Sequence, residues 1–120
     1  MTPRVLLADD HADFRRAART VVQAAGFEVV GEATSGEEAL ELVERLRPNL
    51  VLMDIRMPGM GGIAATRMLA ARRPQTTTIL LSTYAVEDLP PQTLTCGAAG
   101  YVPKAEFGPR ALRRAYCSAR

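Results

Sequence analysis

Apolar and polar positions alternate in blocks along the chain, and the pattern repeats five times. Short apolar runs occupy positions 4–8, 27–33, 50–53, 77–81 and 100–103, with longer amphipathic stretches between them. Most of these runs are continuously apolar, which is typical of strands in a parallel sheet covered on both faces. Because strands alternate with helical patterns, the sequence predicts one doubly wound α/β domain over residues 1–120.

The stretches between the predicted strands have helical spacing and recognisable helix ends. The first helix is expected to stop at Gly26. Ser35 and Glu38 form a capping box, in which the Ser35 hydroxyl bonds the backbone N–H of Glu38 and Glu38 reaches back. A third helix is predicted over about 62–73, and the last follows Pro109, a residue that suits a first helical position.

The fourth predicted helix carries Pro90 and Pro91 near its start. Proline is tolerated in the first turn but not deeper, because it lacks an N–H donor and its ring clashes with the preceding turn. We therefore expect this helix to be short or to start late.

Composition excludes several classes of function. A formal charge of +2 is too close to balance to indicate nucleic-acid binding. No apolar run approaches the roughly 18 residues of a membrane span, and no signal peptide precedes the first strand. Cys96 and Cys117 lack the spacing of a metal or redox pair. These features predict a reduced, cytoplasmic protein.

Polar side chains follow four of the predicted strands. Asp9 and Asp10 follow the first, Asp54 the third, Ser82 the fourth, and Lys104, the single lysine of the chain, the fifth. Each alone has a simpler interpretation as a helix cap, a turn residue or a surface charge. Ligands of parallel sheets bind beyond the carboxyl ends of the strands, so we expect these side chains to form one site.

The residue types in this set suit phosphoryl transfer. Three gathered carboxylates repel one another unless a proton or a cation offsets their charge. Oxygen ligands favour a hard ion such as Mg²⁺. A carboxylate can attack phosphorus and form an aspartyl phosphate, while a metal, a lysine and a hydroxyl neutralise the phosphoryl oxygens.

The same residues lie in four motifs that together resemble the receiver domain of bacterial two-component response regulators. The motifs are Ala8-Asp9-Asp10, Leu52-Met53-Asp54-Ile55-Arg56-Met57-Pro58-Gly59-Met60, Leu81-Ser82-Thr83 and Gly100-Tyr101-Val102-Pro103-Lys104. Their style is most similar to regulators with a C-terminal helix-turn-helix effector. The resemblance implies a flavodoxin-like, five-stranded parallel sheet in the order 2-1-3-4-5, flanked by five helices.

The resemblance also implies a phosphoacceptor and a metal site. Asp54 would accept a phosphoryl group from the phosphohistidine of a sensor histidine kinase. Asp10, Asp54 and the backbone carbonyl of Arg56 would ligate Mg²⁺, and Asp9 would act mainly through water. Lys104 would bond the phosphoryl oxygens.

Three further residues concern the switch and the margin of the site. By the resemblance, Ser82 would move to meet the phosphate and Tyr101 would rotate with it. His11 is expected to be a first-turn residue beside the site rather than a ligand. Ala105 follows Lys104 where the family often has proline, which leaves open whether the peptide after Lys104 is cis.

Two alternatives bear on what the chain does. Haloacid-dehalogenase-like phosphatases also use a strand-end Asp, Mg²⁺ and a Lys, but they usually carry a second Asp two residues after the nucleophile. Arg56 occupies that position, which argues against turnover.

The second alternative is between a stand-alone receiver and an excised one. The sequence ends just after the fifth predicted helix, and we expect a stand-alone receiver that binds no DNA. We expect a homodimer, where one forms, to use the first and fifth helices, with Phe14, Leu112 and Tyr116 as contacts.

Overall fold

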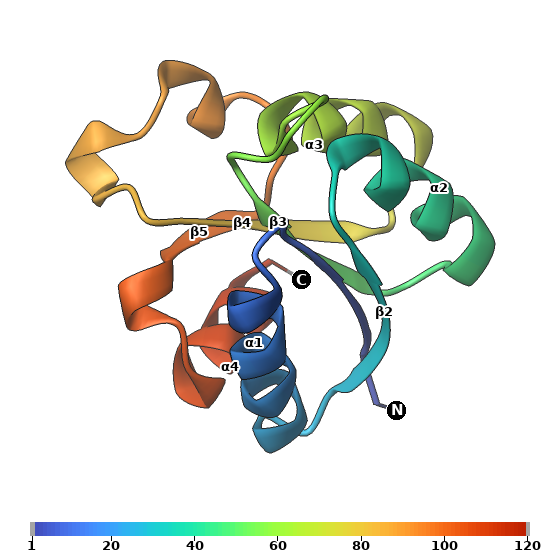
Figure 1. The fold of residues 1–120 in the computed structure, drawn as a ribbon, viewed down its shortest axis with the longest axis vertical. Helices are drawn as coiled ribbons and strands as arrows, with labels where there is room; N and C mark the ends of the chain where they lie inside the picture. The colour runs from blue at the N-terminus through green and yellow to red at the C-terminus, as the bar shows by residue number, and fades with distance from the viewer. Residues whose placement is uncertain (1, 120) are drawn as a thin grey trace.

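The computed structural model describes residues 2–119, which form a five-stranded parallel sheet between two layers of helices (Figure 1). The strands are β1 (Arg4–Ala8), β2 (Glu28–Ala33), β3 (Leu50–Asp54), β4 (Thr77–Ser82) and β5 (Gly100–Pro103). The helices are α1 (Ala12–Ala24), α2 (Gly36–Leu46), α3 (Gly62–Arg72) and α4 (Pro109–Ser118). Helices α1 and α4 cover one face of the sheet, and α2 and α3 cover the other (Figure 1).

The predicted fold class is confirmed. The strand order is β2-β1-β3-β4-β5, and each predicted strand agrees with the observed one to within one residue at either end. The chain reverses its direction of winding between β1 and β3, which are neighbours in the sheet. The crevice beyond the ends of these two strands is where a doubly wound sheet binds its ligands.

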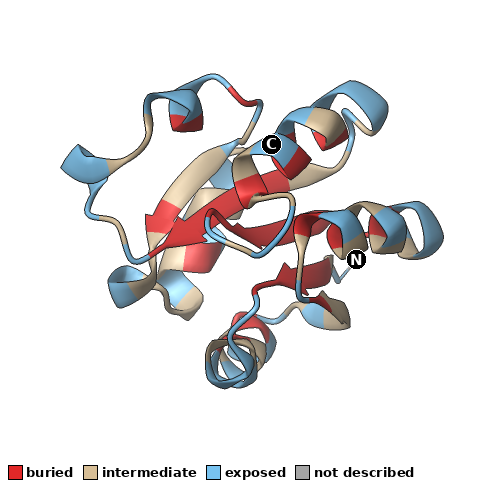
Figure 2. Cartoon of the chain, turned by 45° about the horizontal axis from the view of Figure 1, so that its top comes forward, coloured by how far each residue is buried: buried red, intermediate tan, exposed pale blue. Residues whose placement is uncertain are grey.

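Burial on both faces explains the continuous apolar runs. Along β3, Leu50 and Leu52 pack beneath α1 and α4, while Val51 and Met53 pack beneath α2 and α3. Successive strand residues point to opposite faces, so both sets must be apolar. Figure 2 shows the resulting band of buried strands through the middle of the molecule.

The predicted fourth helix is absent, so the expectation of five helices is wrong for residues 2–119. Two 3₁₀ turns, η1 (Val86–Asp88) and η2 (Pro91–Leu94), replace it. Leu89 and Pro90, which precede the two prolines, are extended, with ψ of 141° and 143°. A residue before proline is pushed away from the helical region, so the two prolines together prevent a helix from starting there.

The start of α2 shows a modified capping box. The Ser35 hydroxyl accepts a hydrogen bond from the backbone N–H of Glu38 at 3.1 Å, as predicted. Glu38 reaches back one residue further than predicted, because its carboxylate accepts from the backbone N–H of Thr34 at 2.7 Å.

None of the helices within residues 2–119 combines the length and apolar character needed to cross a bilayer.

Helix α3 begins at Gly62, close to the end of β3, and a substitution of Gly62 tests this close approach. Its backbone N–H donates to the Ile55 carbonyl at 2.9 Å, and a Cβ at this position would lie 2.0 Å from the Asp54 carbonyl oxygen. We expect Gly62→Ala to lower the free energy of unfolding by about 1–3 kcal/mol, despite the better helix propensity of alanine.

Urea unfolding of the variant measures this cost, with Gly100→Ala as the matched control. A Cβ at Gly100 would meet nothing within 4 Å. Equal stability of the two variants would contradict the close approach of α3 to Asp54.

Candidate functional site

The carboxyl ends of the strands bring the predicted polar residues to one edge of the sheet. Asp9 follows β1, Asp54 ends β3 and Ser82 ends β4. Lys104 begins a 3₁₀ turn, η3 (Lys104–Glu106), directly after β5. Strand register pairs Asp54 with Leu81, the residue before Ser82, and it pairs Ser82 with Pro103, the residue before Lys104. The polar residues of adjacent strands are therefore at the same level of the sheet.

The ammonium of Lys104 lies between two buried carboxylates. Its Nζ is 2.6 Å from Asp9 Oδ2 and 3.5 Å from Asp54 Oδ2. Asp9 Oδ2 is buried and accepts no well-directed hydrogen bond, so its contact with Lys104 is an ion pair. The Lys104 ammonium also lies 4.3 Å from the centre of the Phe14 ring, which adds a cation–π contact on its apolar side.

The environment of Asp54 works against its charge. Burial raises the pKa of the Asp54 carboxyl, and the neighbouring Asp9 charge raises it further, whereas Lys104 and the backbone N–H of Arg56 lower it. The net direction is upward because desolvation outweighs the partial neutralisation by one shared ammonium. An additional cation at this edge would therefore stabilise the charged form of Asp54.

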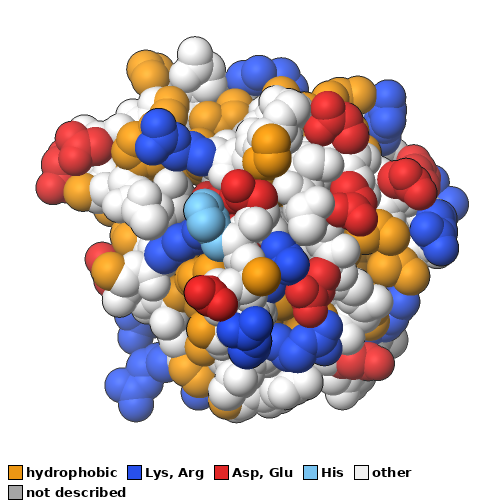
Figure 3. Space-filling view, viewed as in Figure 1, with side chains coloured by type: hydrophobic (Ala, Val, Ile, Leu, Met, Phe, Trp, Pro, Cys, Tyr) orange, Lys and Arg blue, Asp and Glu red, His pale blue; other side chains and the backbone are white. Residues whose placement is uncertain are grey.

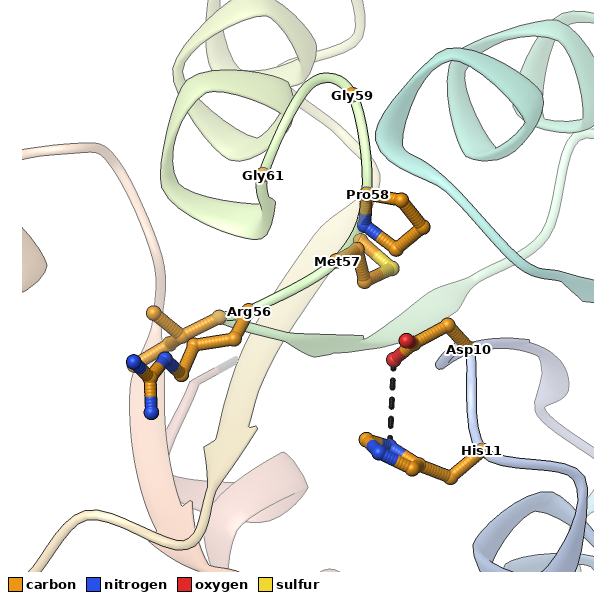
Figure 4. A pocket seen from close by; sticks show the side chains of 8 residues that line it. Asp10, His11, Arg56, Met57, Pro58, Gly59 and Gly61 are labelled. Carbon is orange, nitrogen blue, oxygen red and sulfur yellow. Dashed lines mark ion pairs between the residues drawn. The ribbon is translucent and has the colours of Figure 1, made fainter.

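His11 lies closer to the carboxylates than the sequence suggested. It precedes α1 as its N-cap residue, and its backbone N–H donates to Asp9 Oδ1 at 2.8 Å. Its ring Nδ1 is 3.1 Å from Asp9 Oδ1 and 3.2 Å from Asp10 Oδ1. Figure 4 shows the ring turned toward Asp10, and Figure 3 shows the histidine exposed on the molecular surface beside acidic side-chain atoms.

Nothing in the sequence but the adjacency of His11 to Asp9 and Asp10 pointed to this contact. The direction of the ring depends on the turn that leads into α1.

Four residues can offer ligand atoms to one ion. One atom each from Asp9, Asp10, His11 and Asp54 lies within 4.8 Å of every other. Three of these donors are carboxylate oxygens, which fit Mg²⁺. The predicted metal ligands Asp9, Asp10 and Asp54 are thus brought together.

The loop after β3 is held rigidly beside this cluster. Pro58, Gly59 and Gly61 line a surface pocket with Asp10, His11 and Arg56 (Figure 4). The loop is bound to the start of α2, where the Gly36 N–H donates to the Met60 carbonyl at 3.0 Å and the Glu37 carboxylate accepts from the Met60 N–H at 3.0 Å. These contacts fix the backbone that follows Asp54 without the help of an ion.

Arg56 bridges the loop to the segment after β4. Its backbone N–H lies 3.5 Å from Asp54 Oδ1, a long hydrogen bond. Its guanidinium lies over the Tyr84 ring, 5.3 Å from the ring centre. The Arg56 side chain therefore lies against Tyr84, in the segment that follows β4.

Tyr101 is also connected to that segment. Its hydroxyl donates to the Tyr84 carbonyl at 2.5 Å, with the Ser82 carbonyl oxygen 3.2 Å away. Burial raises the pKa of the Tyr101 phenol, as do the charges of Asp54 and Glu106. The Ser82 hydroxyl, itself buried, lies 3.4 Å from the Tyr84 backbone N–H that donates to it. No peptide bond is cis within residues 2–119, so the bond after Lys104 is trans.

Comparisons with known proteins agree with this geometry. The "Response regulator GacA" of Pseudomonas viridiflava is 41% identical over 102 residues, which cover 84% of this chain and 48% of the relative. The "Response regulator UvrY" of Escherichia coli K12 is 40% identical over 101 residues, covering 83% and 46%. The chain thus spans about half the length of these curated relatives.

A solved structure and a family model give the same assignment. The two-component response regulator of the LuxR family from Aurantimonas sp. SI85-9A1 superposes with a TM-score of 0.87 at 31% identity, covering 98% of this chain and 84% of that one. The family model described as "Response regulator receiver domain" matches residues 5–116. The chain therefore belongs to the receiver-domain family of two-component response regulators.

Proposed function

We propose that the chain is a phospho-accepting signalling switch, in which Asp54 takes a phosphoryl group from a sensor histidine kinase in a Mg²⁺-dependent reaction. The observation that supports this most is the buried Asp54 carboxylate at the end of the central strand, with the Lys104 ammonium 3.5 Å away. A carboxylate oxygen of Asp54 attacks phosphorus while the bond from phosphorus to the kinase histidine breaks.

The metal ligands in this proposal are Asp10, Asp54 and the backbone carbonyl of Arg56, with Asp9 acting through water. The bound ion would supply the positive charge that the three carboxylates lack and would neutralise phosphoryl oxygens during transfer. Fixing the loop after Asp54 to α2 supports the assignment, because it keeps the Arg56 backbone near Asp54. The residues present fit a hard divalent ion.

Lys104 has a second role once phosphate is attached. In the unphosphorylated structure its ammonium forms ion pairs with both Asp9 and Asp54. A phosphoryl group on Asp54 offers it new acceptor oxygens with more negative charge. Lys104 would then stabilise the product, and Ser82 would bond another phosphoryl oxygen.

Ser82 and Tyr101 are proposed to carry the signal away from the site. The Ser82 hydroxyl, which accepts a long 3.4 Å hydrogen bond from the Tyr84 backbone N–H, would gain a phosphoryl oxygen as a further partner on phosphorylation, so phosphate would bias a two-state element. Tyr101 bonds the Tyr84 carbonyl, two residues after Ser82, so a shift of Ser82 would change the position of that acceptor. This coupling supports Tyr101 as the reporter of the switch.

Turnover of an external phosphate ester is not part of the proposal. The comparisons give no support to the haloacid-dehalogenase-like alternative, and Arg56 stands where that class carries its acid/base. Self-phosphorylation and self-dephosphorylation at Asp54 are the chemical steps we assign. The resulting conformational change would control a partner protein or self-association.

The predicted homodimer through α1 and α4 stays untested, but one of its contacts is wrong. Leu112 is fully buried against the sheet and cannot contact a partner. Leu112 lies on the apolar face of an amphipathic helix, and that face packs inward rather than toward a partner. Phe14 and Tyr116 are only partly buried, although each packs against another aromatic ring of the same chain.

The phosphorylation site is tested by intact-mass measurement after incubation with Mg²⁺ and acetyl phosphate. We expect one phosphoryl adduct on the wild type and none on Asp54→Ala. Asp13→Asn, on the exposed first turn of α1, is the control that removes a carboxylate outside the cluster. An adduct that persists in Asp54→Ala and maps to another residue would overturn the assignment.

The raised pKa of Asp54 predicts how stability depends on pH. The Asp54 carboxyl has a higher pKa in the folded state than in the unfolded state, so the folded state keeps its proton to higher pH. The free energy of unfolding therefore decreases as pH rises from the unfolded-state pKa through the folded-state pKa of this group. Asp54→Asn should therefore raise the melting temperature at neutral pH without divalent ions, by roughly 3–5 °C. It should also flatten the pH dependence in the acidic range.

Thermal melts from pH 3 to pH 8, with and without Mg²⁺, measure both effects. Mg²⁺ should raise the melting temperature of the wild type and of Asp13→Asn, and have much less effect on Asp54→Asn. A wild type that is more stable than Asp54→Asn at neutral pH without metal would contradict the unfavourable environment of Asp54.

Lys104 should not be replaceable by arginine, although arginine carries nearly all the positive charge of this chain. The compact ammonium fits between Asp9 Oδ2 and Asp54 Oδ2, whereas a guanidinium is broader and fork-shaped. We expect Lys104→Arg to fold but to be phosphorylated more slowly by acetyl phosphate, by on the order of tenfold or more. Arg113→Lys on exposed α4 is the control, and equal rates for all three proteins would refute the role of Lys104.

A further inference from the structure

We propose that His11 Nδ1 is a direct ligand of the ion held by the carboxylates, so that the site favours a divalent first-row transition ion more strongly than an all-oxygen site would. The inference rests on the metal site of the proposed function and adds to it a nitrogen donor and a preference among ions. The residues that carry it are His11 and Asp10, which would both ligate the ion, and Asp9, which would contact it through water.

The separations of the donor atoms fit one coordination sphere. Ligand bonds of about 2.1 Å in an octahedral site place adjacent ligand atoms about 3 Å apart. His11 Nδ1 lies 3.2 Å from Oδ1 of Asp10, the neighbouring direct ligand in the proposed function, and it belongs to the set of four donors that all lie within 4.8 Å of one another. Asp9 Oδ1, which would act through water, lies 3.1 Å from the same nitrogen. The ring nitrogen thus stands at the distance that a neighbouring ligand of the same ion would occupy.

The backbone fixes His11 in this place. It is extended, with φ of −95° and ψ of 110°, and its N–H donates to Asp9 Oδ1. The His11 ring caps no backbone group of α1. Its side chain is 66% exposed, so it stands at the open side of the cluster, while Lys104, 12% exposed, closes the buried side. The imidazole is therefore accessible to an ion that enters from solvent.

A nitrogen ligand from His11 would change which divalent ions the site prefers. Mg²⁺ binds oxygen ligands and keeps several waters, and gains little from an imidazole. Transition ions gain from a nitrogen donor, in the order from Mn²⁺ through Co²⁺ and Ni²⁺ to Cu²⁺. An oxygen-only cluster would discriminate less between Mg²⁺ and Co²⁺ than a cluster that includes His11. The competing interpretation is that the ring only donates a hydrogen bond to the carboxylates, since such a bond has the same length.

The experiment combines an affinity ratio with a direct probe of nitrogen ligation. Calorimetric titration at one fixed pH gives the Kd for Mg²⁺ and for Co²⁺, and electron spin-echo envelope modulation of bound Mn²⁺ detects a directly coordinated ¹⁴N nucleus. His11→Asn replaces Nδ1 with an amide that can offer an oxygen at a similar distance. Asp13→Asn, two residues along and outside the cluster, controls for local charge and helix start. Asp10→Asn reports whether the ion sits at the carboxylates.

We expect ¹⁴N modulation in wild type and in Asp13→Asn, and its loss in His11→Asn. The ratio of the Mg²⁺ Kd to the Co²⁺ Kd should fall in His11→Asn on the order of tenfold, a change of about 1.4 kcal/mol in relative binding. Ion binding that Asp10→Asn weakens, with no ¹⁴N modulation and an unchanged ratio, would overturn the His11 ligand and leave the proposed function standing. Failure of any ion to bind at the carboxylates would overturn both.

Discussion

One ammonium between two buried carboxylates is the interaction on which the functional edge of this molecule depends. Asp9 and Asp54 are each almost fully buried, and the single lysine of the chain lies between them. Buried like charges are strongly unfavourable unless they are paired, and one cation cannot neutralise two acids and the adjacent Asp10. The negative charge at this edge of the sheet therefore exceeds the positive charge of the one ammonium. That deficit of positive charge makes the edge ready to accept a metal ion. The pKa of Asp54 is raised first by its burial and then by the neighbouring Asp9 charge.

The fold keeps this unfavourable cluster in place by clamping the backbone on both sides of it. The loop after Asp54 is bound to α2 through Met60, and α3 begins so close to Asp54 that only glycine fits at Gly62. On the other side, Asp9 is held by the backbone N–H of His11 and by Lys104. Repulsion among the carboxylates consequently cannot relax by moving the loops apart. The negative charge is concentrated at one place, where a bound cation or a proton can offset it.

The sequence predicted the sheet well because strands buried on both faces leave an unambiguous apolar signal. The same reasoning failed where the outcome depended on side-chain direction or on cooperation between neighbours. Pro90 and Pro91 were each compatible with a first turn, but the residue before each is extended, and the helix does not form. Leu112 lies on the apolar face of α4, which packs inward. The approach of His11 Nδ1 to two carboxylates follows from the turn before α1, which the spacing of motifs does not encode.

The loss of the fourth helix changes how a change at Ser82 would reach the surface under the proposed function. A helix after β4 would move as a rigid body, because its backbone hydrogen bonds are internal. The observed segment has two short 3₁₀ turns and is connected to the rest of the molecule through Tyr84, whose carbonyl accepts from Tyr101 and whose ring lies beneath Arg56. Tyr84 thus joins the loop after Asp54, the end of β4 and the aromatic residue of β5. A displacement of Ser82 would therefore be transmitted first as a local change at Tyr84, because Tyr84 contacts Ser82 directly and also contacts Arg56 and Tyr101.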